Sequence, residues 1–206
     1  MNRKAHWDQI YQTKNLHEFS WYQAVPLTSL NYIRQLGLPL DSKIIDIGGG
    51  DSLLVDHLLD LGYQNITVLD ISESAIERAQ KRLGERATKV TWITADASDF
   101  QTDEIYDLWH DRAAFHFLTE EPEINAYVET ARSHIRPGGF LIMGTFSETG
   151  PTKCSGVDIR QYSAWSLTQR FQPDFEKLEC QQVNHTTPSG RTQNFTFCRF
   201  RRIETA

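Results

Sequence analysis

The chain of 206 residues carries a formal net charge of −6, with 39% hydrophobic and 23% charged residues. This is the composition of an ordinary globular protein, long enough for one domain or for one domain with a short lid. We expect no membrane span and no secretory signal, because no sufficiently long apolar stretch occurs and the opening residues lack an apolar run. A nucleic-acid partner is not expected either, since the one dense basic cluster, Arg199, Arg201 and Arg202, falls at the end of an expected strand.

Cysteine and histidine usage gives no sign of a metal site. The three cysteines, Cys154, Cys180 and Cys198, stand at no spacing typical of metal ligands. Their odd number favours reduced thiols and a cytoplasmic location. The seven histidines do not pair with acids or cysteines at ligand spacing, so we expect no metal.

Strand signals recur along the chain after an aromatic-rich opening segment, residues 1–25. Short runs that are rich in β-branched residues favour strands. These runs cover residues 43–47, 66–69, 90–94, 105–110 and 140–146.

Helix signals separate these strands. Ser52 opens one helix, and a capping box of Ser74 and Glu77 starts the next. A third helix is capped by Thr119 and stopped at Pro137, with apolar residues along one side. The alternation predicts a Rossmann-like, doubly wound α/β fold with parallel strands and helices on both faces of the sheet.

The last quarter of the chain breaks the alternation. A helical stretch over residues 163–171 precedes two strand-like segments, residues 175–183 and 194–202. The turn-rich linker HTTPSGRT between the two segments predicts an antiparallel hairpin. No internal repeat or domain linker interrupts residues 1–206, so we expect a single domain.

The sequence IIDIGGGDS predicts the floor of a ligand site. It places an acid, Asp46, on a buried strand that turns through Gly48, Gly49 and Gly50 into a helix. Glycines let a backbone pass close under a ligand. A dinucleotide fingerprint would place another glycine where Leu53 stands, and an acid beside a pyrophosphate would repel it. The pattern therefore favours a ligand with a cationic amino-acid end.

Two further acids follow the next strands. Asp70 ends the second strand, where an acid accepts hydrogen bonds from ribose hydroxyls. Asp96 and Ala97 follow the third strand, where they are suitably placed for an adenine amino group. A single acid at a strand end is more often a helix cap or turn residue. One acid per strand, in this order, favours an adenosine site.

From residue 41 to residue 139 the chain resembles class I S-adenosylmethionine-dependent methyltransferases, and the terminal hairpin resembles the reversed last strand of their seven-stranded sheet. The glycine motif of that family maps onto Asp46, Gly48 and Gly50, with Ser52 standing in place of the third glycine. The resemblance implies S-adenosylmethionine as cofactor. The residues expected at its site are Trp7, Trp21, Asp46, Gly48, Gly49, Gly50, Ser52, Asp70, Ile71, Ser72, Asp96, Ala97 and Asp111.

The segment after the fourth strand is expected to face the transferable methyl group. It holds Asp111, Arg112 and His116, the expected catalytic residues. Asp111 is expected beside the methionine moiety, and Arg112 or His116 facing the acceptor, with the histidine able to take a proton. The alternative is structural: Asp111 and Arg112 form a local ion pair, and His116 packs in a helix.

Candidate substrate contacts come from later loops. Cys154, Tyr162 and His185 are expected to converge around the methyl group. Cys154 is either a reactive thiol or an inert one. The aromatic residues of segment 1–25 either cover the cofactor as a lid or simply pack against the sheet.

The leading hypothesis is a methyltransferase that acts on a small molecule through oxygen, sulfur or nitrogen. Protein lysine methylation is the runner-up, because W-D-x-x-Y near the start and D-R-x-x-F after the fourth strand resemble relatives that methylate lysines. Ala113 and His116 depart from that motif. Two further alternatives are a nicotinamide-dependent oxidoreductase and a silent adenosyl-binding regulator.

Overall fold

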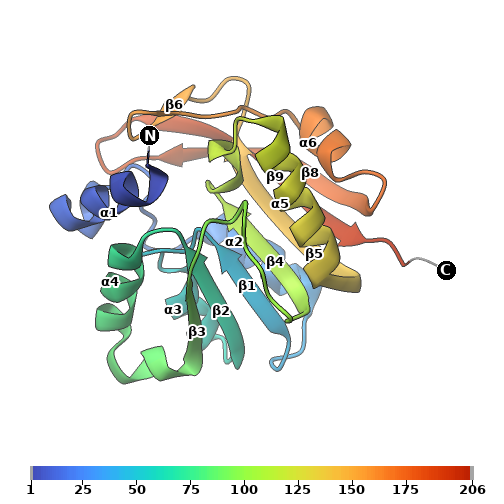
Figure 1. Ribbon diagram of the computed structural model, residues 1–206, viewed down its shortest axis with the longest axis horizontal. Helices are drawn as coiled ribbons and strands as arrows, with labels where there is room; N and C mark the ends of the chain where they lie inside the picture. The colour runs from blue at the N-terminus through green and yellow to red at the C-terminus, as the bar shows by residue number, and fades with distance from the viewer. Residues whose placement is uncertain (1, 205–206) are drawn as a thin grey trace.

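The protein is built on a seven-stranded sheet with the strand order β3-β2-β1-β4-β5-β9-β8, as seen in a computed structural model that describes residues 2–204 (Figure 1). Strands β1 to β5 are parallel, β9 runs antiparallel to β5, and β8 runs antiparallel to β9. This confirms the predicted α/β fold with its terminal hairpin. The strands are β1 (Lys43–Ile47), β2 (Asn65–Asp70), β3 (Val90–Thr94), β4 (Tyr106–Arg112), β5 (Ile135–Phe146), β8 (Phe175–Thr186) and β9 (Thr192–Arg202).

Helices cover both faces of the sheet. Helices α5 and α6 pack on one face around Trp109 and Tyr127, and α2 and α3 pack on the other with Leu30 and Leu58. The α-helices are α1 (Arg3–Thr13), α2 (Leu27–Leu36), α3 (Leu54–Asp60), α4 (Glu73–Leu83), α5 (Glu121–His134) and α6 (Ala164–Phe171). Short elements are the 3-10 helices η1 (Leu16–Glu18), η2 (Gly84–Lys89) and η3 (Phe115–Phe117), and the small hairpin of β6 (Lys153–Cys154) and β7 (Val157–Asp158).

Two element boundaries differ from the sequence-based prediction. Helix α4 is capped by Ser72 and not by Ser74, since the Ser72 hydroxyl accepts a hydrogen bond from the backbone of Ala75. Pro137 does not stop a helix, because α5 has already ended at His134 and the chain from Ile135 onward is extended as β5. Neither difference moves the ends of the strands that carry the site.

The prediction of three reduced thiols is wrong for one pair. Cys180 and Cys198 lie directly opposite each other on β8 and β9 and form a disulfide. The register of the two strands brings them together, and a spacing along the sequence cannot reveal that register. Cys154 is free and buried.

Helix α1 is anchored on α4 and lies above it in the view of Figure 1. The Ser72 hydroxyl donates to Asp8 Oδ1 at 2.7 Å, and Arg78 Nη1 donates to the backbone oxygens of Tyr11 and Lys14, each at 2.7 Å. The opening segment is therefore fixed to the end of α4 that follows Asp70. No helix within residues 2–204 is long and apolar enough to span a membrane.

Candidate active site

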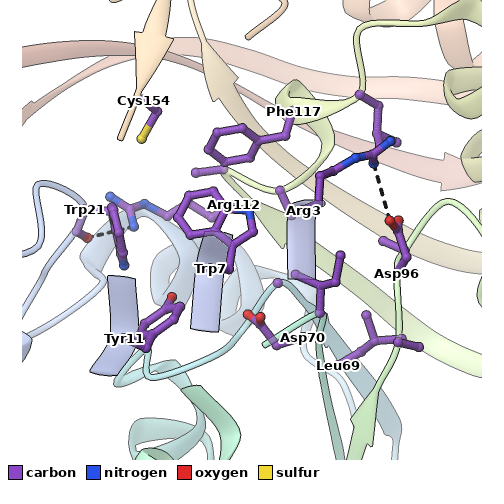
Figure 2. A pocket seen from close by; sticks show the side chains of 17 residues that line it. Arg3, Trp7, Tyr11, Trp21, Leu69, Asp70, Asp96, Arg112, Phe117 and Cys154 are labelled. Carbon is purple, nitrogen blue, oxygen red and sulfur yellow. Dashed lines mark hydrogen bonds and ion pairs between the residues drawn. The ribbon is translucent and has the colours of Figure 1, made fainter. Parts of the chain in front are cut away.

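A cavity opens at the carboxyl ends of β1, β2, β3 and β4 and is covered by the opening segment (Figure 2). Its empty volume is about 760 Å³, which includes space open to solvent. Ligands of open α/β sheets bind at this edge. The lining residues are Arg3, Trp7, Tyr11, Trp21, Gly48, Leu69, Asp70, Ile71, Ala95, Asp96, Ala97, Arg112, Ala113, Ala114, Phe117, Leu118 and Cys154.

The glycine turn after β1 leaves no room for side chains. Gly48 has a φ of +64°, and a Cβ there would stand 2.5 Å from the Cβ of Ala114. Gly50 has a φ of +42°, and a Cβ there would stand 2.6 Å from Asp70 Oδ2 and 3.0 Å from the Tyr11 hydroxyl. Only glycine combines a positive φ with such close approach. Of the turn, Gly48 lines the cavity, whereas Gly49 and Gly50 lie outside its lining.

Asp46 lies beneath this turn and does not line the cavity. Its Oδ1 is 2.7 Å from His110 Nδ1, and His110 Nε2 is 2.8 Å from the Ser29 hydroxyl. An ionised carboxylate only accepts, so His110 Nδ1 carries the proton that it donates to Asp46. A Cβ on Gly49 would stand 2.7 Å from Asp46 Oδ2, so this carboxylate supports the turn from below. Contact between Asp46 and a cofactor stays a prediction.

Asp70 presents a carboxyl group to the cavity from the end of β2. Its Oδ1 accepts a hydrogen bond of 2.8 Å from the Ser72 backbone, and the residue is buried. Burial, assisted by the charges of Asp46 and Asp8, raises the pKa of Asp70 to about 7. A carboxyl group of this kind is well suited to accept hydrogen bonds from a ligand, because the ligand restores the polar partners that burial removed.

The two residues after Asp70 divide between the cavity and the helix. Ile71 lines the cavity. Ser72 caps α4 and does not line it. Ser52 also lies outside the lining, where its hydroxyl accepts a hydrogen bond from the backbone of Leu54 at 3.2 Å. Ser52 therefore precedes the N-cap residue of α3, which is Leu53, and contacts the first helical amide from outside the helix.

Asp96 and Ala97 line the cavity beyond β3. Asp96 Oδ1 accepts hydrogen bonds from the backbone and the hydroxyl of Ser98, at 2.9 and 2.7 Å. Asp96 Oδ2 pairs with Arg3 Nη1 at 3.4 Å, and Arg3 Nη2 also pairs with Glu123. Sequence reasoning missed Arg3, because nothing in a lone arginine near the start of the chain indicates that it reaches two distant elements.

Aromatic side chains of the opening segment form one wall. The ring of Trp7 lies 5.9 Å from that of Trp21 and 4.9 Å from that of Phe117, and Tyr11 lies 6.1 Å from Trp21. Trp7 and Trp21 line the cavity, and their contact with a cofactor stays a prediction. Movement of this segment as a lid stays a prediction.

Asp111 lies outside the cavity, against the expectation that it contacts the methionine moiety. Its carboxylate accepts hydrogen bonds from the backbone of Ala114 and Phe115 and one of 2.6 Å from the Tyr127 hydroxyl. Burial raises its pKa to about 6, although these hydrogen bonds act in the opposite direction. Asp111 thus shapes the turn after β4, and it forms no ion pair with Arg112.

His116 is not available as a base. Its Nδ1 accepts a hydrogen bond of 3.2 Å from the backbone of Phe146, so Nε2 carries the proton of the neutral ring. Burial and the nearby charge of Arg112 lower the pKa of His116 to about 3. The ring packs against Phe117 and Phe146 outside the cavity lining, which matches the structural alternative.

The three residues Cys154, Tyr162 and His185 do not converge on the cavity as predicted. Only Cys154 lines it. Tyr162 is buried against Phe115. His185 donates from Nε2 to the backbone oxygen of Ser20 at 2.6 Å, which fixes β8 to the opening segment. Burial raises the pKa of the Cys154 thiol to about 11, so the thiol stays neutral and is not activated.

Arg112 lines the cavity from the end of β4, and its facing the acceptor stays a prediction. Its Nη1 donates to the backbone oxygen of Trp21 at 3.0 Å, and its guanidinium carbon lies 5.2 Å from the centre of the Phe195 ring. Burial lowers the pKa of Arg112 to about 10, which leaves it charged at neutral pH. Among residues 2–204 no group of three or more His, Cys, Asp or Glu side chains has the arrangement of a metal site.

Residues 44–139 match the model of a family described as a methyltransferase domain. The chain is 25% identical over 120 residues to a ubiquinone biosynthesis O-methyltransferase of Rickettsia felis, covering 58% of this chain and 48% of that protein. It is 28% identical over 121 residues to the eEF1A lysine and N-terminal methyltransferase of Mus musculus, covering 58% of this chain and 17% of that protein. The chain thus spans less than half the length of either relative.

A solved structure has the same fold. The fold matches that of the N-methyltransferase NodS from Bradyrhizobium japonicum in complex with S-adenosylhomocysteine, with a TM-score of 0.71 and 19% identity over 96% of this chain and 98% of that one. At this identity the likeness concerns the fold. Taken with the family model and the cavity, it supports one class: residues 44–139 are similar to the domain of class I S-adenosylmethionine-dependent methyltransferases.

Proposed function

We propose that this protein transfers the methyl group of S-adenosylmethionine to a small-molecule acceptor through an oxygen, sulfur or nitrogen atom. The observation that carries the proposal is the cavity at the carboxyl ends of the strands. A glycine turn without room for side chains, a buried carboxyl group at Asp70 and a second carboxylate at Asp96 meet there. The aromatic residues of the opening segment cover the same cavity.

The residues present fit the cofactor. A Cβ at Gly48 or Gly50 would collide with its surroundings, so the turn offers backbone at the place where the methionine end would lie. Asp70 would accept the ribose hydroxyls, and Asp96 would accept the adenine amino group once Arg3 yields part of its pairing. Bound S-adenosylmethionine supplies an electrophilic methyl group on a sulfonium sulfur.

The chain would contribute position and exclusion of water more than proton transfer. The carboxylates that line the described cavity are Asp70 and Asp96, and no histidine lines it. Cys154 is a neutral thiol. Alignment of the reacting atoms alone can lower a barrier by roughly 7–11 kcal/mol. The enclosing rings of Trp7, Trp21 and Phe117 would keep water from the reacting groups.

The test uses S-adenosylmethionine with a labelled methyl group and a cell lysate divided into metabolite and protein fractions. Label is expected in the metabolite fraction with the wild-type protein and not with Asp70→Ala. If neither fraction acquires label although the protein binds S-adenosylhomocysteine, the protein is an adenosyl-binding regulator and the proposal fails.

Protein lysine methylation is a second candidate, supported by the similarity to the eEF1A lysine and N-terminal methyltransferase. The covered cavity favours the small molecule, because a lysine side chain on a protein surface would have to pass the ring wall of Trp7 and Phe117. Label in the protein fraction alone would support lysine methylation in place of the leading proposal.

A further inference from the structure

Arg112 is a cation in the cavity wall whose charge has no acidic partner. Its Nη1 donates to the backbone of Trp21, but its Nη2 is buried and has no hydrogen-bond partner within the described chain. Arg3 also lines the cavity, but its charge is paired, because it forms ion pairs with both Asp96 and Glu123. The two arginines lie toward opposite sides of the cavity, with Trp7 between them (Figure 2).

Arg112 is partly buried as a whole, but its Nη2 is fully removed from solvent, and burying a charged donor without a partner is costly. Across residues 2–204, no carboxylate lies within 4.0 Å of the Arg112 nitrogens. Asp46 acts on Arg112 only through its charge, because its Oδ1 is hydrogen-bonded to His110. Removing a charge from water without a partner costs far more than removing a neutral polar group. Retention of the cation in the cavity wall therefore points to a partner that arrives with a ligand.

The surroundings of Arg112 define what else that ligand carries. Trp7, Trp21 and Phe117 present ring surfaces, and the neutral thiol of Cys154 adds a further apolar contact. None of these groups supplies a charge to the ligand. A guanidinium in an aromatic wall matches a planar anionic oxygen group, which it can bind through two parallel hydrogen bonds.

We propose, on the basis of the function proposed above, that the methyl acceptor is a small organic acid with an apolar or aromatic body. Its carboxylate, or an anionic oxygen group of the same shape, pairs with Arg112. The rings of Trp7, Trp21 and Phe117 hold its body. Arg112 is therefore a determinant of acceptor specificity and not a base.

The charge of the methyl donor gives a second reason for an acidic acceptor. A sulfonium ion is cationic, and in a cavity of low polarity a like charge on Arg112 disfavours its binding. An anionic acceptor offsets both cations when it binds. The acceptor would therefore bind preferentially to the enzyme that already holds S-adenosylmethionine.

The probes for the test are benzoate and benzamide, which share a ring and nearly the same shape but differ in charge. The full-length protein is saturated with S-adenosylhomocysteine, and binding is followed by the fluorescence of the tryptophans that line the cavity. Wild-type protein is expected to bind benzoate at least about tenfold more tightly than benzamide, as one charge-assisted pair provides.

Variants assign this preference to one residue. Arg112→Gln should abolish the preference for benzoate, and Arg112→Lys should keep part of it because the charge and the stem remain. Arg3→Gln is the matched control, since it removes a cation from the same cavity that already has two acidic partners. Arg3→Gln should keep the preference. Equal binding of both probes by the wild type, or a preference that survives in a folded Arg112→Gln, overturns the inference.

The carboxylate of the cofactor is the alternative partner for Arg112, in place of an acidic acceptor. Calorimetry with S-adenosylhomocysteine and with 5′-methylthioadenosine, which lacks the carboxylate, separates the two partners. If Arg112→Gln weakens only S-adenosylhomocysteine, the guanidinium holds the cofactor and the inference is wrong. If the wild type binds neither adenosine compound, the proposed function fails instead, and the benzoate comparison on the free protein still tests Arg112.

Discussion

Asp70 should give the proposed cofactor site a dependence on pH that can be measured directly. Its pKa is raised to about 7, and only the ionised carboxylate can accept hydrogen bonds on both oxygens. A group with this pKa is about nine-tenths ionised at pH 8 and about one-tenth ionised at pH 6. Affinity for S-adenosylhomocysteine should therefore fall about tenfold between pH 8 and pH 6, as measured by calorimetry.

Asp70→Asn is the perturbation that isolates this group. Asparagine can still accept the hydrogen bond from Ser72 through its amide oxygen, but it carries no charge and does not titrate. The variant should bind S-adenosylhomocysteine about ten- to a hundredfold more weakly at pH 8, because a hydrogen bond to a charged acceptor contributes roughly 1.5–3 kcal/mol. Its affinity should no longer change between pH 6 and pH 8.

The same substitution should have the opposite effect on stability. The folded-state pKa of Asp70 lies above its ordinary value of 3.8, so the folded protein binds the proton more tightly and loses stability as the pH rises through about 7. The rise to about 7 corresponds to about 4 kcal/mol at most, at 1.36 kcal/mol per pH unit. Asp70→Asn should thus be more resistant to urea than the wild type at pH 8, with little difference at pH 4. A pH-independent affinity of the wild type, with unchanged binding by the variant, would refute this account.

Three further predictions concern the turn, the cofactor and the thiol. Gly50→Ala should abolish binding of S-adenosylhomocysteine in calorimetry, because the new Cβ would displace Asp70 and Tyr11. Gly37→Ala is the control: Gly37 also has a positive φ, but a Cβ there would meet nothing within 4 Å, so this variant should bind normally. Normal binding by Gly50→Ala would exclude the turn from the site. The melting temperature should rise with S-adenosylmethionine and S-adenosylhomocysteine but not with NAD or NADP, and a rise with NAD alone would favour an oxidoreductase. Cys154→Ser should keep turnover within about threefold, because a neutral thiol is not a nucleophile, and loss of methyl transfer in a folded variant would show that the thiol contacts the substrate.

The sheet and most residues at the predicted cofactor end of the cavity could be predicted because each follows from a local pattern. Gly48, Asp70 and Asp96 each stand at the end of a parallel strand, and the ends of parallel strands meet at one edge of the sheet. Strand order does not need to be known in detail for this argument. Helix α2 gave no comparably clear signal, although Leu30 and Ile33 pack in the core.

The acceptor end could not be predicted as well, because side-chain direction decides it. Asp111 and Arg112 are neighbours on β4, and side chains alternate between the two faces of a strand. Asp111 therefore joins the hydrogen bonds to Tyr127, while Arg112 reaches Trp21 and the cavity. His116 lies only four residues further, yet a backbone donor of β5 fixes its ring outside the cavity. These outcomes depend on contacts across the fold and leave no pattern along the sequence.

The distribution of charge in the cavity connects the two halves of the site. Asp70 and Asp96 place acidic groups at the ends of β2 and β3, and Arg3 neutralises part of that charge in the absence of ligand. Arg112 places an unpaired cation at the end of β4. A ligand that donates hydrogen bonds is favoured at the acidic side, and an anion is favoured at the other. A cavity with this polarity would bind a hydroxyl-bearing nucleoside on the side of Asp70 and Asp96. An acidic acceptor would bind next to it, on the side of Arg112.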